Sequence, residues 1–330
     1  MSLLDVPATF SSRAKNGGSF AFCGDAIYDA GLGCPNRSLV QLSLMMINKV
    51  CILPRHWFNS RVVKHTTRRA SLSSSSCCDE LIRRYDDTVN SVTTLTLNNP
   101  KKYNVLSSAV LDAMQLQLDD IAANDSISVL VIRSTGNAFS AGHDLKEIHA
   151  HGTNEETVAL FQKCSKLMMS VNKLPQPVIA SVQGIATAAG CQLVASCDLA
   201  VAANEATFGV SGINVGLFCS TPAVALSRNV HAKQAMHMLL TGDLISSEQA
   251  VAYGLINKAV SMDTLEAETM MLAKKVASKS NYAIRLGKDV FYKQLQCDDL
   301  KDAYELTTER IASNFQHDDT KRMIAKFVNK

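Results

Sequence analysis

The fold of this chain is decided by residues 184–209, which read GIATAAGCQLVASCDLAVAANEATFG. Small residues lead into an apolar segment at residues 190–196, which has the length of a short helix. Residues 199–203 then form an apolar run of the kind found in buried strands. A strand that follows a helix so closely predicts an α/β domain.

Outward from this stretch, apolar runs alternate with segments of helical spacing. The predicted strands are residues 92–97, 128–134, 178–182 and 199–203. The predicted helices are residues 106–121, 154–171, 190–196, 262–278, 282–294 and 299–313. Ser107 and Ser108 are expected to cap the first helix, and Pro175 and Pro177 to end the second. We therefore expect an α/β core over residues 83–260 and a helical region over residues 261–330.

The composition excludes several classes of protein. A net charge of +3 is too small to indicate nucleic-acid binding. No apolar run approaches the roughly 18 to 20 residues that a membrane span requires. The ten cysteines show no CxxC spacing, so we expect free thiols in a reducing compartment, with neither disulfide staples nor a metal site.

Residues 1–82 differ from the rest of the chain. Between residues 45 and 78 there are six Lys or Arg, two His, a serine cluster and no acidic residue. This composition is typical of a mitochondrial transit peptide, and a disordered basic arm is the alternative. Residues 1–44 contain Asp5, Asp25 and Asp29, which do not fit such a peptide. Met45 or Met46 is therefore our hypothesis for the start used for import.

Two loops combine small residues with the start of a helix. They are residues 139–146, FSAGHDLK, and residues 184–192, GIATAAGCQ. Small residues let the backbone approach a ligand, and the free N–H groups at a helix N-terminus can bind an oxyanion. Two such donors on one carbonyl would stabilise an enolate by a few kcal/mol. Close packing alone is the other interpretation of each loop.

In this order, the two loops and their surroundings resemble the enoyl-CoA hydratase/isomerase (crotonase) superfamily over residues 90–330. The resemblance is carried by NPK and NVL at residues 99–106, AFSAGHDLKE at 138–147, PVIA at 177–180, GCQLVASCDLAVAANEATFG at 190–209 and LTG at 240–242. It implies a ClpP-like spiral of ββα units, a helical C-terminal trimerisation region, and homotrimers or homohexamers. It also implies a mitochondrial matrix protein of fatty acid metabolism that takes an acyl-CoA or enoyl-CoA, without a further cofactor.

The resemblance assigns roles to particular residues. The backbone N–H groups of Ala141 and Ala189 take the places of the oxyanion hole. Lys101 and Lys102 lie where the family contacts the far end of CoA. The remaining residues on the thioester and pantetheine side are Gly142, His143, Asp144, Thr187 and Gly190.

The chain departs from the family at both hydratase glutamates, whose positions hold Gln192 and Gly212. A glutamine can hydrogen-bond a water but cannot accept its proton, and a glycine offers no side chain. Between residues 157 and 242 the only acids are Asp198 and Glu205, which match structural positions of the family. Conventional hydration is therefore not expected.

Other side chains offer alternatives. His143 has the reference pKa of a general base or acid, although it would equally serve to cap the loop or face solvent. Cys219 and Ser220 are nucleophiles without a base partner in the sequence. Asp144 is expected to cap the helix that follows it.

Two classes of function remain open. We favour an acyl-CoA-binding protein without hydratase activity. The alternative is an enzyme with weak or altered hydratase, isomerase or thioester chemistry, which would use the oxyanion hole with His143 or a bound water. A trimeric scaffold with a closed pocket is a third reading.

Overall fold

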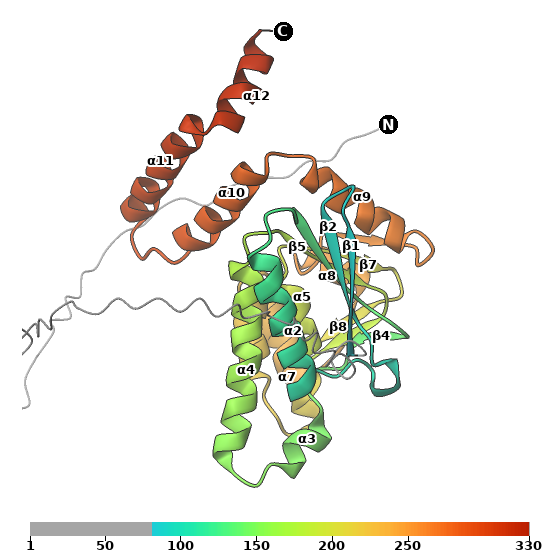
Figure 1. The fold of residues 1–330 in the computed structure, drawn as a ribbon. Helices are drawn as coiled ribbons and strands as arrows, with labels where there is room; N and C mark the ends of the chain where they lie inside the picture. Colours follow the sequence, from blue (N-terminus) through green and yellow to red (C-terminus); the bar gives the residue numbers. More distant parts are fainter. Residues whose placement is uncertain (1–80, 330) are drawn as a thin grey trace, which may run out of the picture. The chain divides into compact units, whose positions relative to one another are not determined.

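The computed structural model describes residues 81–329, and every structural statement below concerns that part of the chain (Figure 1). The strands are β1 (Ile82–Asp87), β2 (Val92–Leu97), β3 (Val129–Ser134), β4 (Ala138–Ser140), β5 (Val178–Val182), β6 (Ile185–Thr187), β7 (Leu199–Ala203), β8 (Thr207–Gly209), β9 (Ile245–Ser246) and β10 (Lys258–Val260). The α-helices are α2 (Ser108–Ala122), α3 (Leu145–Ala150), α4 (Asn154–Lys173), α5 (Ala189–Ser196), α6 (Ser220–Leu226), α7 (Ala232–Thr241), α8 (Ser247–Ala252), α9 (Leu265–Ala277), α10 (Asn281–Gln294), α11 (Leu300–Gln316) and α12 (Asp318–Val328). Two 3-10 helices, η1 (Pro100–Lys102) and η2 (Ser211–Val215), complete the list.

The strands form two sheets, and from β3 to β8 consecutive strands alternate between them. The six-stranded sheet has the order β1-β2-β3-β5-β7-β10, and the four-stranded sheet has the order β4-β6-β8-β9. In chain order, β3, β5 and β7 each belong to the first sheet, and each is followed by a strand of the second. The pairings β2–β3, β3–β5, β5–β7, β4–β6 and β6–β8 are all parallel. This repeated strand–strand–helix order is the expected spiral of ββα units.

The inner strands β3, β5 and β7 of the six-stranded sheet are buried on both faces, which explains their continuous apolar runs. One face joins the main core, to which β3 contributes Leu130 and Ile132. The other face, with Val129 and Val131 of the same strand, packs beneath α9 through Ala273. Because successive side chains alternate between faces, both sets must be apolar.

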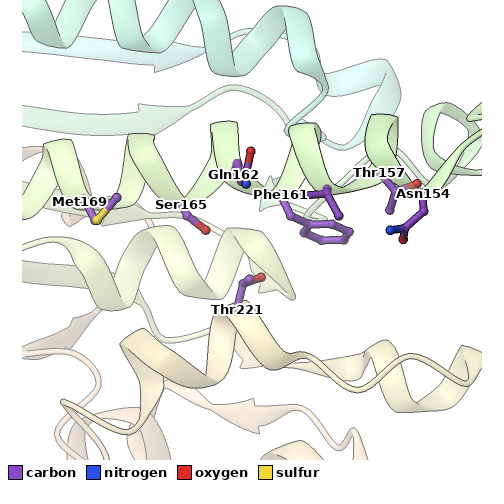
Figure 2. Close-up of a pocket in the computed structure, with 8 residues that line it drawn as sticks. Asn154, Thr157, Phe161, Gln162, Ser165, Met169 and Thr221 are labelled. Atoms are coloured by element: carbon purple, nitrogen blue, oxygen red, sulfur yellow. The ribbon is translucent and has the colours of Figure 1, made fainter. Parts of the chain in front are cut away.

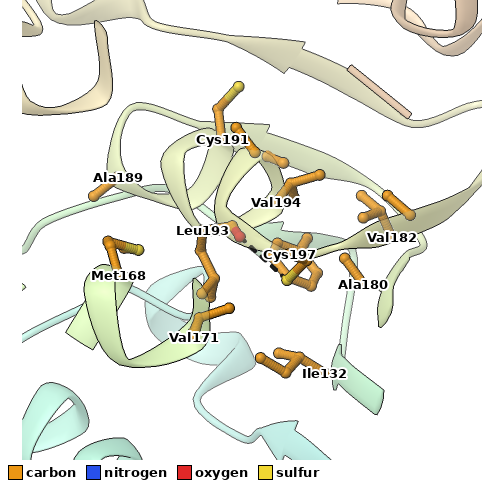
Figure 3. Packing of buried hydrophobic residues seen from close by; sticks show 14 of the residues in the cluster. Ile132, Met168, Val171, Ala180, Val182, Ala189, Cys191, Leu193, Val194 and Cys197 are labelled. Atoms are coloured by element: carbon orange, nitrogen blue, oxygen red, sulfur yellow. Dashed lines mark hydrogen bonds between the residues drawn. The ribbon is translucent and has the colours of Figure 1, made fainter. Parts of the chain in front are cut away.

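Helix α5 lies at the centre of the main core, and all eight of its residues are buried. Figure 3 shows Leu193 and Val194 of α5 among Met168 and Val171 of α4 and the side chains of the neighbouring strands. The Cys197 thiol donates to the Leu193 carbonyl at 3.3 Å. The N-terminus of α5 is therefore held in place by the closely packed side chains of the main core.

The sequence-based elements agree with the structure where the apolar pattern is strong. The strands predicted at 92–97, 178–182 and 199–203 have the observed bounds. Helix 106–121 begins instead at Ser108, because Ser107 is the N-cap and accepts from the Val110 N–H. Several short elements were not predicted, namely β1, β4, β6, β8, β9, β10, α6, α7, α8 and α12.

The C-terminal part is helical, as expected. Helix α10 is joined to the body by Lys288, whose ammonium donates to the Val171 carbonyl, the Gln176 carbonyl and the Asp198 carboxylate. Tyr292 donates to the same carboxylate at 2.9 Å. None of the residues in α10, α11 or α12 is fully buried. No helix within residues 81–329 is both long and apolar enough to cross a membrane.

The expectations for the N-terminal extension, the transit peptide and the starting methionine concern residues that precede the described part. The described chain starts at Leu81, and β1 starts at Ile82, one residue before the expected start of the core. Cys164, Cys191, Cys197, Cys219 and Cys297 are free thiols, as expected for these five positions.

Candidate functional site

The two small-residue loops meet at one place. The first follows β4, and the second leads from β6 into the N-terminus of α5. Gly142 has a φ of +87°, which favours glycine, and a Cβ there would lie 2.8 Å from the Ala188 Cβ and 3.0 Å from the Ala189 nitrogen. A Cβ on Gly190 would lie 2.3 Å from the Ser140 carbonyl oxygen. The loops are therefore in direct backbone contact, as an oxyanion site would require.

The backbone donors differ from the expected pair at one position. The Ala141 N–H donates to the Tyr103 carbonyl at 2.9 Å, so it has no hydrogen to offer a ligand. The Gly142 N–H donates to the Ser140 hydroxyl at 3.2 Å. His143 carries the next amide, and within residues 81–329 neither this amide nor that of Ala189 has a hydrogen-bond acceptor. Of the two amides expected as donors, that of Ala189, the first residue of α5, is thus open to a ligand, whereas that of Ala141 is engaged and the amide of His143 beside it is open.

Backbone strain marks the same loops. Four non-glycine residues of the described chain have a positive φ, namely Ser91, Tyr103, Asn104 and Ala188. Ala188 precedes the Ala189 donor and has φ 50° and ψ −120°, while Tyr103 and Asn104 hold the Ala141 loop. Such conformations cost of the order of 1 to 3 kcal/mol each and persist only where the surroundings impose them. Three of the four positions thus adjoin the candidate site.

The imidazole of His143 is held in one tautomer. Its Nδ1 lies 3.2 Å from the Leu106 carbonyl, and because a carbonyl only accepts, Nδ1 carries the hydrogen. Burial lowers the pKa of His143, against the opposing effects of the Leu106 carbonyl and the Glu147 carboxylate. The neutral ring therefore has its lone pair on Nε2, which is buried and without a partner. Its ring meets Phe161 of α4 edge to face, with 5.0 Å between centroids.

Residues 192 and 212, the two positions expected for the hydratase glutamates, carry no acid. Gln192 is 4% exposed, and its Oε1 is buried without a hydrogen-bond partner. A Cβ on Gly212 would lie 2.6 Å from the Leu217 carbonyl oxygen and 2.7 Å from the Cys219 sulfur. The space that a side chain at 212 would need is thus already filled.

Two of the nearby acids, Asp198 and Asp144, have structural partners. Asp198 accepts from Lys288, Tyr292 and the Val178 N–H, which confirms its structural role. Glu205 is exposed in the turn between β7 and β8. Asp144 is the N-cap of α3, as expected, and accepts from the Lys146 N–H at 3.0 Å.

The two lysines lie beside the first loop. Lys101 and Lys102 belong to η1, and both are exposed. The Lys102 ammonium lies 3.4 Å from the Asp144 carboxylate. Burial alone would raise the pKa of Asp144, but the Lys146 N–H and Lys102 hold it below its usual value. On the second loop, the Thr187 hydroxyl lies 2.9 Å from that of Ser211, next to Gly212.

Cys219 and Ser220 do not have the partners of catalytic nucleophiles. Burial raises the pKa of the Cys219 thiol, against the effect of the Gly212 N–H that donates to its sulfur at 3.3 Å. Ser220 is exposed, and its hydroxyl donates to the Phe218 carbonyl. Across residues 81–329, no group of three His, Cys, Asp or Glu side chains could hold a metal ion.

A hollow of about 640 Å³ lies between α4 and α6, and sequence reasoning did not identify it. Figure 2 shows Phe161 of α4 and Thr221 of α6 pointing into it. Its other lining residues all belong to α4 and are Asn154, Thr157, Val158, Gln162, Ser165 and Met169. Since Phe161 also contacts the His143 ring, the hollow begins beside the loop junction. Exposed Val158 and Met169 on a helix with a buried opposite face were the signal for it.

Comparisons with known proteins agree with this architecture. Residues 87–330 match the family described as Enoyl-CoA hydratase/isomerase. Enoyl-CoA hydratase domain-containing protein 3, mitochondrial, is 45% identical over 236 residues in Mus musculus, covering 72% of this chain and 78% of that protein. Its human counterpart is 45% identical over 242 residues, covering 73% of this chain and 80% of that protein.

Solved structures extend the likeness to three dimensions. The crystal structure of human enoyl Coenzyme A hydratase domain-containing protein 3 has a TM-score of 0.73 and 44% identity, covering 76% of this chain and 97% of that one. An enoyl-CoA hydratase of Mycobacterium smegmatis has a TM-score of 0.74 and 44% identity, covering 76% and 96%. The chain therefore belongs to the enoyl-CoA hydratase/isomerase family and has its crotonase fold.

Proposed function

We propose that this chain is a mitochondrial protein of fatty acid metabolism that binds an acyl-CoA or enoyl-CoA without conventional hydratase activity. The observation that carries the proposal is an intact pair of backbone donors beside two glutamate positions that hold Gln192 and a sterically closed Gly212. The location rests on the relatives that are named mitochondrial.

The site has the chemistry to bind a thioester. The amides of His143 and Ala189 would donate to its carbonyl oxygen, and the positive end of α5 would favour the partial charge on that oxygen. Exposed Lys101 and Lys102 would meet the phosphates of CoA. The largely apolar hollow along α4 is the space available to an acyl chain.

The same site lacks the chemistry for hydration. Addition of water needs one group that takes a proton from water and one that gives a proton to the α-carbon. Gln192 can do neither, and Gly212 has no side chain. The carboxylates of Asp144 and Asp198 are bound to other partners.

A lysine pair offers a direct test with a matched control. Lys101→Ala with Lys102→Ala is expected to weaken binding of octanoyl-CoA, measured by calorimetry, about tenfold or more, since it removes two cations from the phosphate end. Lys274→Ala with Lys275→Ala removes the same charge from α9, which packs on the face of the six-stranded sheet opposite the main core. This control is expected to leave the affinity within about twofold of wild type. Equal losses in both pairs would mean that CoA binds elsewhere or through net charge alone.

One observation favours a second candidate, an enzyme with altered chemistry. His143 is neutral, and its buried Nε2 lone pair has no partner, so it has the form of a general base. Under this reading, turnover of an enoyl-CoA or an acyl-CoA thioester would be lost in His143→Asn. The absence of any turnover in the wild-type chain would remove this candidate.

The proposal includes assembly into a homotrimer or homohexamer. Large apolar side chains are exposed along the last three helices, and they include Phe291, Leu300, Tyr304, Ile311, Phe315 and Phe327. A surface of this kind is usually covered by another chain. Light scattering is expected to give a mass of three or six copies, and Ile311→Asp with Phe315→Asp is expected to give monomers. A monomeric wild-type chain would contradict this part of the proposal.

A further inference from the structure

Residues 99–106 form a strained segment, of which the proposed function uses only the two lysines. Tyr103 and Asn104 are consecutive non-glycine residues with φ of 51°, a left-handed conformation that side chains disfavour. Asn104 is also only 2% exposed, although it is polar. A buried polar residue in a strained turn is kept in place by specific partners, and its partners show what it holds.

The Asn104 amide makes three hydrogen bonds to the backbone. Its Oδ1 accepts from the Asn99 N–H at 2.8 Å, which closes the segment on itself. Its Nδ2 donates to the Thr135 carbonyl and to the Ala138 carbonyl, both at 2.8 Å. Both hydrogens of the amide are therefore used on the chain that leads from β3 into β4. Strand β4 runs directly into the loop that carries Gly142 and His143.

The same segment also contacts that loop directly. The Tyr103 carbonyl accepts from the Ala141 N–H at 2.9 Å, and the Leu106 N–H donates to the Gly142 carbonyl at 2.7 Å. The Leu106 carbonyl then fixes Nδ1 of His143. Three successive contacts thus set the position of the loop, and with it the free amide of His143, relative to the N-terminus of α5.

The other end of the segment carries the lysines. Lys101 and Lys102 precede the strained pair, and Lys102 reaches back to Asp144 at the end of the loop. Residues 99–106 therefore carry the two lysines that would meet the phosphates of a ligand. They also position the loop whose amide would meet its carbonyl group. Asn104 is the side chain that locks this piece to β4.

We infer that Asn104 is a positioning residue. It holds Lys101 and Lys102 and the His143 amide at the spacing of the phosphates and the carbonyl group of an acyl-CoA thioester. This inference rests on the proposed function and adds to it a residue without ligand contact. It acts through the backbone of Tyr103 and Leu106, which in turn sets the His143 amide. Loss of Asn104 should therefore weaken binding of a ligand that contacts both the lysines and the His143 amide more than binding of a ligand that contacts the lysines alone.

The experiment replaces Asn104 with aspartate. Aspartate keeps an oxygen that accepts from the Asn99 N–H, but it places a second oxygen, in place of the NH2 group, against the carbonyls of Thr135 and Ala138. The matched control is Asn229→Asp, because the Nδ2 of Asn229 also donates to two backbone carbonyls, those of Ala195 and Ala225. Asn104→Gly is the second variant, since glycine tolerates the positive φ and removes the side-chain hydrogen bonds of Asn104. Affinities for octanoyl-CoA and for free CoA are measured by calorimetry, and melting temperatures on the same samples.

Asn104→Asp and Asn104→Gly are expected to lose about tenfold in affinity for octanoyl-CoA, equal to about 1.4 kcal/mol, and less than about threefold for free CoA. Asn229→Asp is expected to lower the melting temperature while both affinities stay at wild-type values. If the Asn104 variants behave like Asn229→Asp, the inference is wrong and the binding proposal stands. If the wild-type chain binds neither ligand, the proposed function itself fails.

Discussion

The filled space at Gly212 makes a quantitative prediction about restoring a hydratase. A Cβ at this position would lie 2.6 Å from the Leu217 carbonyl oxygen and 2.7 Å from the Cys219 sulfur. Ordinary contact begins at about 3.5 Å, so even a methyl group overlaps two atoms by close to 1 Å. One of them is a backbone atom in a turn closed by the Leu217 N–H on the Gly212 carbonyl.

Overpacking of this kind costs about 1 to 3 kcal/mol. For a domain of this size Gly212→Ala should therefore lower the melting temperature by roughly 2 to 12 °C. Gly212→Glu should cost at least as much, because its longer side chain must leave the same place. Cys219→Ala in the Gly212→Ala background should recover part of the loss, since it removes one of the two contacts.

Thermal unfolding of the Gly212 variants measures the loss of stability. A separate assay, which follows the loss of the ultraviolet absorbance of an enoyl thioester, measures hydration. Gln192→Glu alone and Gln192→Glu with Gly212→Glu are expected to show no hydration, because no second carboxylate can reach the ligand from position 212. The reasoning is refuted if Gly212→Glu melts at the wild-type temperature, or if the double variant hydrates the substrate.

Further predictions concern buried polar groups. Burial holds the pKa of His143 in the folded chain below its unfolded value of 6.5. The unfolded chain therefore takes up a proton first, and the stability of the fold decreases as the pH drops below about 6.5. Between about pH 8 and pH 5 the melting temperature should decrease less in His143→Asn than in the wild-type chain, and an equal decrease would contradict this. Lys288→Met leaves the buried Asp198 carboxylate without its cation and two backbone carbonyls without this donor, and should cost about 3 to 5 kcal/mol in chemical unfolding. Lys293→Met, from an exposed pair on the same helix, should cost under about 0.5 kcal/mol; similar losses in both would argue against the role of burial. Gln192→Met removes an unpaired buried oxygen and should stabilise the chain by about 1 kcal/mol, whereas a loss of stability would reveal a partner for the amide.

Elements with a strong apolar pattern followed from the sequence. Strands β2, β5 and β7 lie inside the six-stranded sheet with nearly all their residues buried, so their apolar and β-branched runs indicated their bounds. Strands β4, β6 and β8 have three residues each, too few to show an alternation, and they are defined by pairing with one another. Strand β1 is an edge strand with the polar sequence IRRYDD, which has no apolar run to identify it.

The residue types of the candidate site could be predicted from the sequence, but its backbone geometry could not. The side chains at 192 and 212 can be read directly, so the absence of carboxylates was clear from the sequence. The engagement of the Ala141 amide was not, because it depends on a carbonyl presented by Tyr103 in a left-handed conformation. The Nε2 lone pair of His143 depends likewise on the position of Leu106. Long-range backbone geometry of this kind has no local signal in the sequence.

The most direct test of the central claim is to titrate a medium-chain enoyl-CoA into the purified chain in a calorimeter and then follow its ultraviolet absorbance in the same sample. The account predicts saturable binding with no loss of the enoyl absorbance. Saturable binding with steady hydration would contradict it, and would show that a group other than a glutamate at 192 or 212 moves the proton.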